Sequence, residues 1–115
     1  MSDAPVLAPM NHITDLEAAG DFEKKHTPRI GIEENDGKTF VWVRVGHYVP
    51  HPNQPDHYIQ WIELQANGNT VARFDLSPVA TDPHVRVQVA LDPGTVVRAI
   101  AYCNLHGLWA AERTL

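Results

Sequence analysis

Histidine is unusually frequent in this chain, with seven among 115 residues, and there is a single cysteine. Most of these side chains fall in three short segments, which are Glu23–Pro28, Gly46–His57 and Cys103–Trp109. Imidazole and thiolate groups bind transition metals, and functional groups commonly sit in loops held by a rigid scaffold. The three segments therefore predict a metal site if the fold brings them together.

The spacing Cys103-x-x-His106 lets a thiolate and an imidazole reach one metal ion from a single turn. The same spacing also fits a buried cysteine beside a surface histidine, and Cys103 can equally be a core filler or a nucleophile. A structural zinc site usually has more than one cysteine. A blue-copper site usually adds an axial methionine, but the only methionines, Met1 and Met10, do not follow His106.

Alternation of apolar and polar residues predicts that β-strands position these segments. The predicted strands cover residues 39–45, 58–64, 71–76, 85–91, 95–102 and 110–115. Asn67-Gly68 and Pro93-Gly94 are turn signals between neighbouring strands. Short strands joined by turns, with no helices between them, predict an all-β antiparallel sandwich or barrel.

One short helical turn is expected near the N-terminus. Thr14 and Glu17 have the spacing of a capping box, and Gly20 is a suitable C-cap, so a helix is predicted over residues 14–19. Residues 1–12 show no periodicity and are expected to form an arm. Residues 1–115 together are expected to form a single domain.

Composition narrows the function further. Apolar residues make up 43% of the chain and charged residues 20%, which is typical of a folded globular domain. A net charge of -5 argues against nucleic acid as a partner. No apolar run is long enough for a membrane helix, and the N-terminus lacks the basic start of a secretory signal. One cysteine suits a reducing compartment, so a cytoplasmic location is expected.

Together the segments resemble the iron domain of superoxide reductases, the neelaredoxin and desulfoferrodoxin family. The resemblance runs from about residue 23 to residue 109 and rests on Lys25-His26 with Pro28, His51-Pro52-Asn53 with His57, Trp61-Ile62, and Cys103-Asn104-x-His106-Gly107-Leu108-Trp109. The four-cysteine iron domain found in part of the family is absent from the sequence. The resemblance is therefore to the one-iron class, and it implies an immunoglobulin-like β-sandwich.

The resemblance implies one mononuclear iron per chain that alternates between Fe2+ and Fe3+. The implied equatorial ligands are His26, His51, His57 and His106, and the implied axial ligand is Cys103. Five ligands leave one position of an octahedron open, and the thiolate donates electron density toward it. The implied reaction is one-electron reduction of superoxide to hydrogen peroxide. An external donor such as rubredoxin restores Fe2+, and a homo-oligomer, dimer or tetramer, is implied.

The first segment departs from the family pattern, in which Glu-Lys-His places a glutamate on the sixth position of resting ferric iron. Here Lys24 stands two residues before His26, Lys25 keeps its place, and Glu23 comes one residue earlier than usual. The sixth ligand can be Glu23, solvent or nothing. Lys25, Lys24 and Arg29 are the cations expected to attract superoxide, and Lys25 can also hold a water that protonates peroxide.

The remaining histidines are expected to be non-ligands. His12 and His84 are expected to be solvated, whereas His47 is near enough to His51 in sequence to lie behind the site without binding metal. Two other functions stay open. One is an electron-transfer sandwich with copper or iron and no superoxide turnover, and the other is a metal-binding or sensing module without catalysis.

Trp61 and Trp109 are expected to be core or site-wall residues rather than electron relays. Asn53 and Asn104 each stand beside a predicted ligand. Asparagine commonly bonds nearby backbone groups, so both are expected to fix the turns that carry the ligands.

Overall fold

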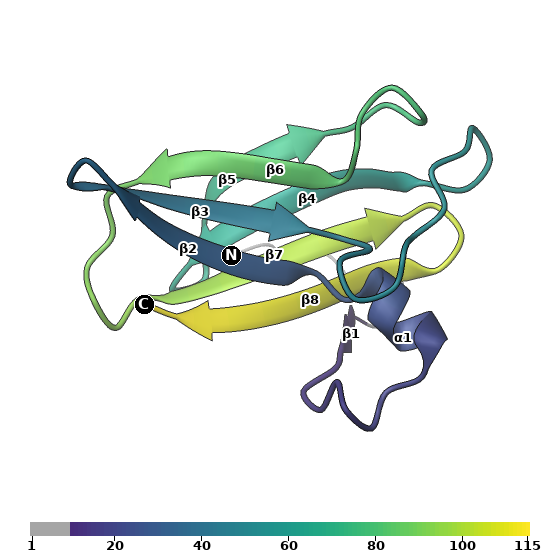
Figure 1. The fold of residues 1–115 in the computed structure, drawn as a ribbon, viewed down its shortest axis with the longest axis horizontal. Coiled ribbons are helices and arrows are strands. Elements are labelled where there is room, and N and C mark those ends of the chain that lie inside the picture. The colour runs from purple at the N-terminus through teal and green to yellow at the C-terminus, as the bar shows by residue number, and fades with distance from the viewer. Residues whose placement is uncertain (1–9) are drawn as a thin grey trace.

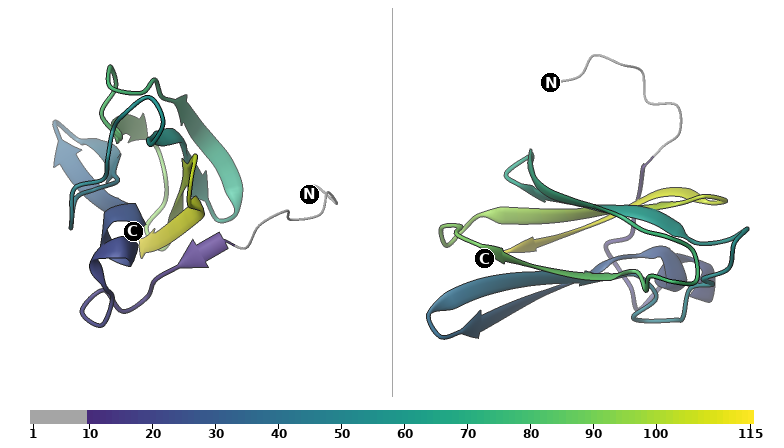
Figure 2. Two further views of the ribbon diagram at one scale, coloured as in Figure 1. Left: turned by 90° about the vertical axis from the view of Figure 1, so that its right-hand side faces the viewer. Right: turned by 90° about the horizontal axis from the view of Figure 1, so that it is seen from above.

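Two β-sheets packed face to face make up most of the structure, a computed structural model in which residues 10–115 are described (Figures 1 and 2). The elements are β1 Met10–His12, α1 Asp21–His26, β2 Arg29–Asn35, β3 Lys38–Arg44, β4 Ile59–Ala66, β5 Asn69–Asp75, β6 His84–Val89, β7 Val96–Cys103 and β8 Gly107–Thr114. The five-stranded sheet has the order β1-β8-β7-β4-β5, and the three-stranded sheet has the order β2-β3-β6. The predicted all-β sandwich with little helix is confirmed.

The core lies between the two sheets and explains why these segments form strands. In β4 the side chains of Ile62 and Leu64 are buried, whereas the alternate residues Trp61 and Glu63 are only half-buried. β3 contributes valines with the same period of two, as the sequence predicts. Full burial of each such aliphatic side chain contributes about 1.5–3 kcal/mol to folding.

Two hairpins join neighbouring strands through two-residue turns. Asn67 and Gly68, between β4 and β5, both have positive φ angles of 47° and 85°, and the hairpin predicted there is confirmed. Asp36 and Gly37, between β2 and β3, adopt the same left-handed backbone with φ angles of 52° and 73°. No strand is predicted at β2 from the sequence, and this second hairpin is seen only in the structure.

The prediction of a helix over residues 14–19 is wrong, because this segment forms only a turn at residues 16–18. The helix that forms is α1, and Gly20 is its N-cap rather than the C-cap of a preceding helix. Its first turn carries Asp21 and Glu23, and its last turn carries Lys24 and Lys25. Acidic residues near the N-terminus and basic residues near the C-terminus interact favourably with the helix dipole, so this order of charges stabilises α1.

The last three residues of the predicted N-terminal arm belong to a sheet. Met10–His12 form β1, which pairs in parallel with β8 from Leu108 to Ala110. Residues 1–9 of the predicted arm lie outside the described residues. Within residues 10–115, none of the helical structure has the length and apolar character needed to cross a membrane.

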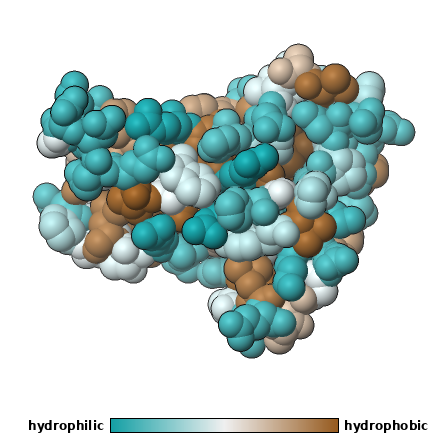
Figure 3. Space-filling view, viewed as in Figure 1, coloured by the Kyte–Doolittle hydropathy of each residue, from teal (hydrophilic) through white to brown (hydrophobic). Residues whose placement is uncertain are grey.

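One end of the sandwich gathers the three histidine-rich segments. β4 and β8 begin there, β3 and β7 end there, and α1 packs beside them, at the right of Figure 1. The opposite ends of the strands carry the short hairpins. The face of the molecule in Figure 3, which the three-stranded sheet covers, is mainly hydrophilic, with apolar residues in small separate groups.

Candidate metal centre

Four histidine rings from three segments form a closed ring at this end of the sandwich. The centroids of His26 and His51 are 4.8 Å apart, those of His51 and His57 4.9 Å, those of His57 and His106 5.1 Å, and those of His106 and His26 4.9 Å. Neighbouring rings are steeply inclined, with interplanar angles from 71° to 83°. The structure therefore brings all four predicted histidines together.

Cys103 lies beside this ring on its inner side. Its Sγ atom is 3.8 Å from Nδ1 of His106, and its side chain is completely buried against the core. Donor atoms of His26, His57, Cys103 and His106 all lie within 4.8 Å of one another. His51 is outside this tight group of four, although its ring adjoins those of His26 and His57.

Backbone carbonyls set the orientation of two of the rings. Nδ1 of His26 donates to the carbonyl oxygen of Phe22 at 2.7 Å, and Nδ1 of His51 donates to that of Pro52 at 2.6 Å. These bonds place the lone pair of each neutral ring on its Nε2 atom. In His51 and His57, Nε2 is buried and has no hydrogen-bond partner among the described residues. Such buried nitrogens normally have a partner, so the arrangement fits a bound metal ion.

The loop from β3 to β4 holds His51 and His57 by two local devices. Gly46 has a φ of +85°, and a Cβ atom at this position would lie 2.8 Å from the backbone nitrogen of His51. Only glycine allows the chain to approach itself so closely here. His57 is fixed by a tight turn, in which its backbone N–H and carbonyl both bond to Gln54 at 3.1 Å and 2.9 Å.

Asn104 ties the cysteine segment to the His57 segment. Its Oδ1 accepts from the backbone N–H of Tyr58 at 2.9 Å, and its Nδ2 donates to the carbonyl of Asp56 at 2.9 Å. The two partners flank His57 on either side. The amide next to Cys103 therefore holds the positions of two predicted ligands relative to each other.

Asn53 has the same function for the loop that contains His51. Its Oδ1 accepts from the backbone N–H of Val79 at 2.8 Å, and its Nδ2 donates to the carbonyl of Thr81 at 3.2 Å. Bonds from both asparagines to backbone groups are confirmed. In each case the bonds cross to a neighbouring loop and do not stay within the asparagine's own turn.

Aromatic side chains form one wall of the ring. Trp109 stacks on His26 with a centroid distance of 4.7 Å and an interplanar angle of 19°, and its Nε1 donates to the carbonyl of His106 at 3.1 Å. Trp109 is thus a site-wall residue. Phe22, which is not among the predicted site residues, packs edge-on against His106 with a centroid distance of 4.9 Å. Its position four residues before His26 in α1 is the sequence signal that could have identified it.

The other histidines do not join the ring. His47 is exposed, and its Nε2 accepts from Nη1 of Arg29 at 3.2 Å. His84 is the exposed first residue of β6, and His12 is exposed on β1. The exposed positions of His12 and His84 agree with the expectation that both are solvated.

Lys25 and Glu23 are the charged residues of α1 that are expected beside the ring. The pKa of His57 is lowered first by burial and then by the charges of His106 and Lys25. By contrast, a Cβ at Gly20 would lie 3.1 Å from Oε2 of Glu23, so this carboxylate points to the start of α1. A role for Glu23 as the sixth ligand stays a prediction.

Burial also lowers the pKa of His51, from 6.5 to about 4. The unfolded chain therefore binds this proton more readily than the folded chain between these pH values. The contribution of neutral His51 to stability is complete above pH 6.5 and declines as the pH falls to about 4. We expect the metal-free protein to lose up to about 3 kcal/mol of unfolding free energy across this window. Urea unfolding at a series of pH values, with His51→Gln as the comparison, measures this loss, and a flat profile in the wild type would contradict it.

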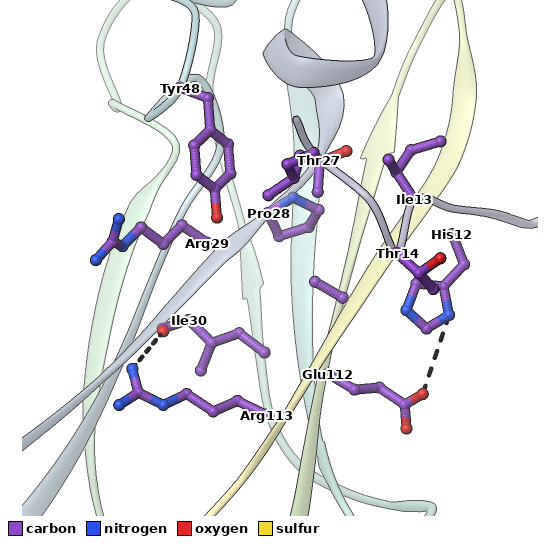
Figure 4. A pocket seen from close by; sticks show the side chains of 12 residues that line it. His12, Ile13, Thr14, Thr27, Pro28, Arg29, Ile30, Tyr48, Glu112 and Arg113 are labelled. Carbon is purple, nitrogen blue, oxygen red and sulfur yellow. Dashed lines mark hydrogen bonds and ion pairs between the residues drawn. The ribbon is translucent and has the colours of Figure 1, made fainter. Parts of the chain in front are cut away.

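The ring is separate from a pocket of about 530 Å³ that lies over β2 and β8 (Figure 4). This pocket is lined by Thr27 and Pro28, which directly follow His26, and by Tyr48 and Arg113 among others. None of the five predicted metal donors lines it. The chemistry suggested by the donor atoms therefore belongs to the ring and not to this pocket.

Known families give an independent view of the chain. A family model described as Desulfoferrodoxin matches residues 18–112. A superoxide reductase from Pyrococcus furiosus is 32% identical in an alignment of 122 positions that covers 90% of this chain and 98% of the relative. The matched region includes every predicted metal donor.

Solved structures agree with this similarity. A superoxide reductase from Nanoarchaeum equitans has a TM-score of 0.78 and 29% identity, covering 93% of this chain and 100% of its own. A superoxide reductase (neelaredoxin) from Ignicoccus hospitalis has a TM-score of 0.76 and 33% identity, covering 92% of this chain and 93% of its own. The likeness thus extends over nearly the full length of both proteins.

Proposed function

The chain belongs to the desulfoferrodoxin family of neelaredoxin-type superoxide reductases, and from that premise we propose how it reduces superoxide. The reaction takes place at one mononuclear non-haem iron per chain. The residues that would hold this iron are His26, His51, His57 and His106, through their imidazole rings, and Cys103, through its thiolate. The observation that carries this assignment is the closed ring of four imidazoles with a buried thiol beside it.

The donor atoms suit iron. Imidazole nitrogens and one thiolate form a mixed set, and five such donors would leave room for a small anion on the metal. When bound, the iron supplies the electron that turns superoxide into hydrogen peroxide. The buried Nε2 atoms of His51 and His57, which have no protein partner among residues 10–115, support their assignment to the metal.

The protein's own groups prepare this site. The carbonyls of Phe22 and Pro52 hold the rings of His26 and His51 in one orientation and increase the basicity of their Nε2 atoms. Cys103 is fully buried, so its thiolate faces little competition from water. His106 is exposed, which gives superoxide a short path from solvent.

Lys25 is proposed to attract superoxide and to hold the water that delivers a proton to the product. Replacing Lys25 by alanine should slow the bimolecular reaction with superoxide about fivefold. The reason is that one screened charge contributes about 1 kcal/mol to the attraction of the anion. The salt dependence of the rate should weaken, and iron should be retained. Pulse radiolysis at several ionic strengths measures both effects.

Lys38→Ala is the matched control, since it removes the same charge from the exposed hairpin at the opposite end of β3. We expect this variant to keep nearly the wild-type rate. Equal rates and equal salt dependence in both variants would exclude the role of Lys25, and Lys24 would be tested next.

The decisive experiment for the proposed function loads the protein with iron under anaerobic conditions and adds superoxide. A superoxide reductase consumes one reduced iron and forms one hydrogen peroxide per superoxide, without releasing oxygen. The oxidised protein should show a thiolate-to-iron charge-transfer band toward the red end of the spectrum. Iron binding without oxidation by superoxide would instead favour an electron-transfer or sensing protein, and a preference for copper would exclude the iron assignment.

The remaining parts of the proposal concern the surroundings of the enzyme. An external one-electron donor of the rubredoxin type restores ferrous iron, since residues 10–115 contain a single cluster of metal donors. We also propose that the protein is a cytoplasmic homo-oligomer. The single cysteine in the sequence supports a reducing compartment.

A further inference from the structure

An aromatic stack lies on the outer face of the five-stranded sheet. Tyr102 of β7 pairs with Trp61 of β4, and their rings are nearly parallel, with centroids 5.7 Å apart and an interplanar angle of 12°. The guanidinium of Arg73, on the neighbouring strand β5, lies 4.2 Å from the centre of the Trp61 ring. We call these three half-exposed side chains the Trp61 stack.

The Trp61 stack is joined covalently to the proposed metal centre. Tyr102 directly precedes Cys103, and neighbouring residues of a strand point to opposite faces of the sheet. The thiol of Cys103 is completely buried on the inner face, while the Tyr102 ring is half-exposed on the outer one. Their Cα atoms are only about 3.8 Å apart. A short run of covalent bonds therefore links the outer surface to the proposed axial ligand.

We propose that a small one-electron donor protein docks on the Trp61 stack, and that its electron reaches the metal through Tyr102 and Cys103. The inference rests on the proposed function, which requires such a donor. The donor loses one electron and ferric iron gains it. No bond is made or broken, no proton moves, and neither aromatic ring is itself oxidised.

The side chains of the stack suit such a partner. Trp, Tyr and Arg are the residues that most often dominate the energy of protein interfaces. Leu108, the β8 partner of Tyr102, extends the half-buried apolar row on the same face. The face in Figure 3 has only small, separate apolar groups, so it offers a donor less continuous contact.

The position of the stack also separates the two reactants. His106 is the exposed member of the ring, and superoxide is proposed to approach there. The Trp61 stack lies on the outer face of the sheet, behind Cys103. A donor bound there leaves the path of superoxide open, so oxidation and re-reduction of the iron do not compete for one surface.

The test uses the iron-loaded oxidised protein and reduced rubredoxin as the probe. Trp61→Leu and Tyr102→Leu should each slow reduction by rubredoxin about tenfold or more. Tyr102→Phe should keep most of the rate, since it preserves the stacked ring. Reduction by ascorbate, the reaction with superoxide and the visible spectrum should stay unchanged in all three variants.

Trp42→Leu is the matched control, because Trp42 is a half-buried tryptophan on the outer face of the other sheet and also has an arginine, Arg29, near its ring. It should keep the wild-type rate with rubredoxin. A second readout does not depend on turnover: when rubredoxin is titrated in, the indole N–H resonance of Trp61 should shift and that of Trp42 should not.

Several outcomes would overturn the docking proposal. A wild-type rubredoxin rate in Trp61→Leu would do so, as would an equal loss with ascorbate, which indicates damage to the metal site. The proposal would also fail if rubredoxin shifted only the NMR resonances of the exposed residues Phe22 and Leu105, beside His26 and His106. It would fail as well if sedimentation showed a homo-oligomer that Trp61→Leu dissociates, because a second copy of this chain would then cover Trp61. Failure of the proposed function is different, since that protein would hold no iron or would not be oxidised by superoxide.

Discussion

Serine in place of Cys103 should leave a folded protein that has lost its red absorption and nearly all of its turnover. The band requires a thiolate, and a serine hydroxyl stays protonated where a metal-bound thiol does not. Changes to groups that only support metal ligands typically cost 10–100-fold in activity or affinity. Loss of the axial ligand itself should therefore lower turnover by at least about 100-fold. Iron content, the visible spectrum and superoxide consumption measure the effect.

The fold should survive this change, because the core keeps its aliphatic residues on both sheets. Ala101→Ser is the matched control, because it introduces the same hydroxyl at a neighbouring buried position. Ala101 is fully buried and lies two residues before Cys103 on the same face of β7. Each buried hydroxyl without a partner costs about 1–3 kcal/mol of stability. If Cys103→Ser kept its colour and turnover, or lost no more than Ala101→Ser, Cys103 would not be the axial ligand.

Alanine in place of His51 should weaken iron binding about 100-fold or more, because it opens one corner of the imidazole ring. His51 is the proposed ligand with the greatest need of a test, since its donor atom lies outside the tight group of the other four. Its case rests on a buried, unpartnered Nε2 and on ring contacts to His26 and His57. Competition with a chelator of known affinity measures the dissociation constant.

His47→Ala serves as the control for this variant. His47 lies in the same loop, four residues earlier, but is exposed and bonded to Arg29. It should keep wild-type affinity for iron. Added imidazole should partly restore iron binding in His51→Ala by filling the space of the lost ring. Equal affinity in the two variants would remove His51 from the ligand set.

The strands of the core could be predicted because their sequences repeat with a period of two. Val41, Val43 and Val45 alternate with polar or aromatic residues, and Ile62 and Leu64 do the same in β4. β2 lacks such a pattern, since Ile30 and Ile32 are followed by three polar residues. The dipeptide Asp36-Gly37, which favours a left-handed two-residue turn, was the available sequence signal for this hairpin.

Two neighbouring segments, residues 14–19 and residues 21–26, compete to form the helix, and the local sequence pattern does not show which one prevails. Thr14 and Glu17 have capping-box spacing, yet α1 begins after Gly20, which makes no side-chain cap bond. The charge order along α1 and the packing of Phe22 and His26 at the ring favour the later segment. β1 is three residues long and gains its place only from β8, so no local sequence signal predicts it.

The histidine and cysteine segments were recognisable from their residue types, but their geometry was not. The crossing bonds of Asn53 and Asn104 depend on which loops the fold places side by side. The same is true of Gly46, whose need for glycine comes from the backbone of His51. Sequence spacing thus identified the candidates, and tertiary contacts decide how they meet.

The ring of histidines also has a consequence for the stability of the protein. His26 and His106 are 80 residues apart in sequence, yet Nε2 of one lies 3.1 Å from Nδ1 of the other. A site assembled from such distant residues does not exist in the unfolded chain, so a metal ion would bind the folded state alone. Iron held by both histidines would therefore cross-link α1 to the turn between β7 and β8. Each tenfold excess of free metal over its dissociation constant then adds about 1.4 kcal/mol to the stability of the folded state.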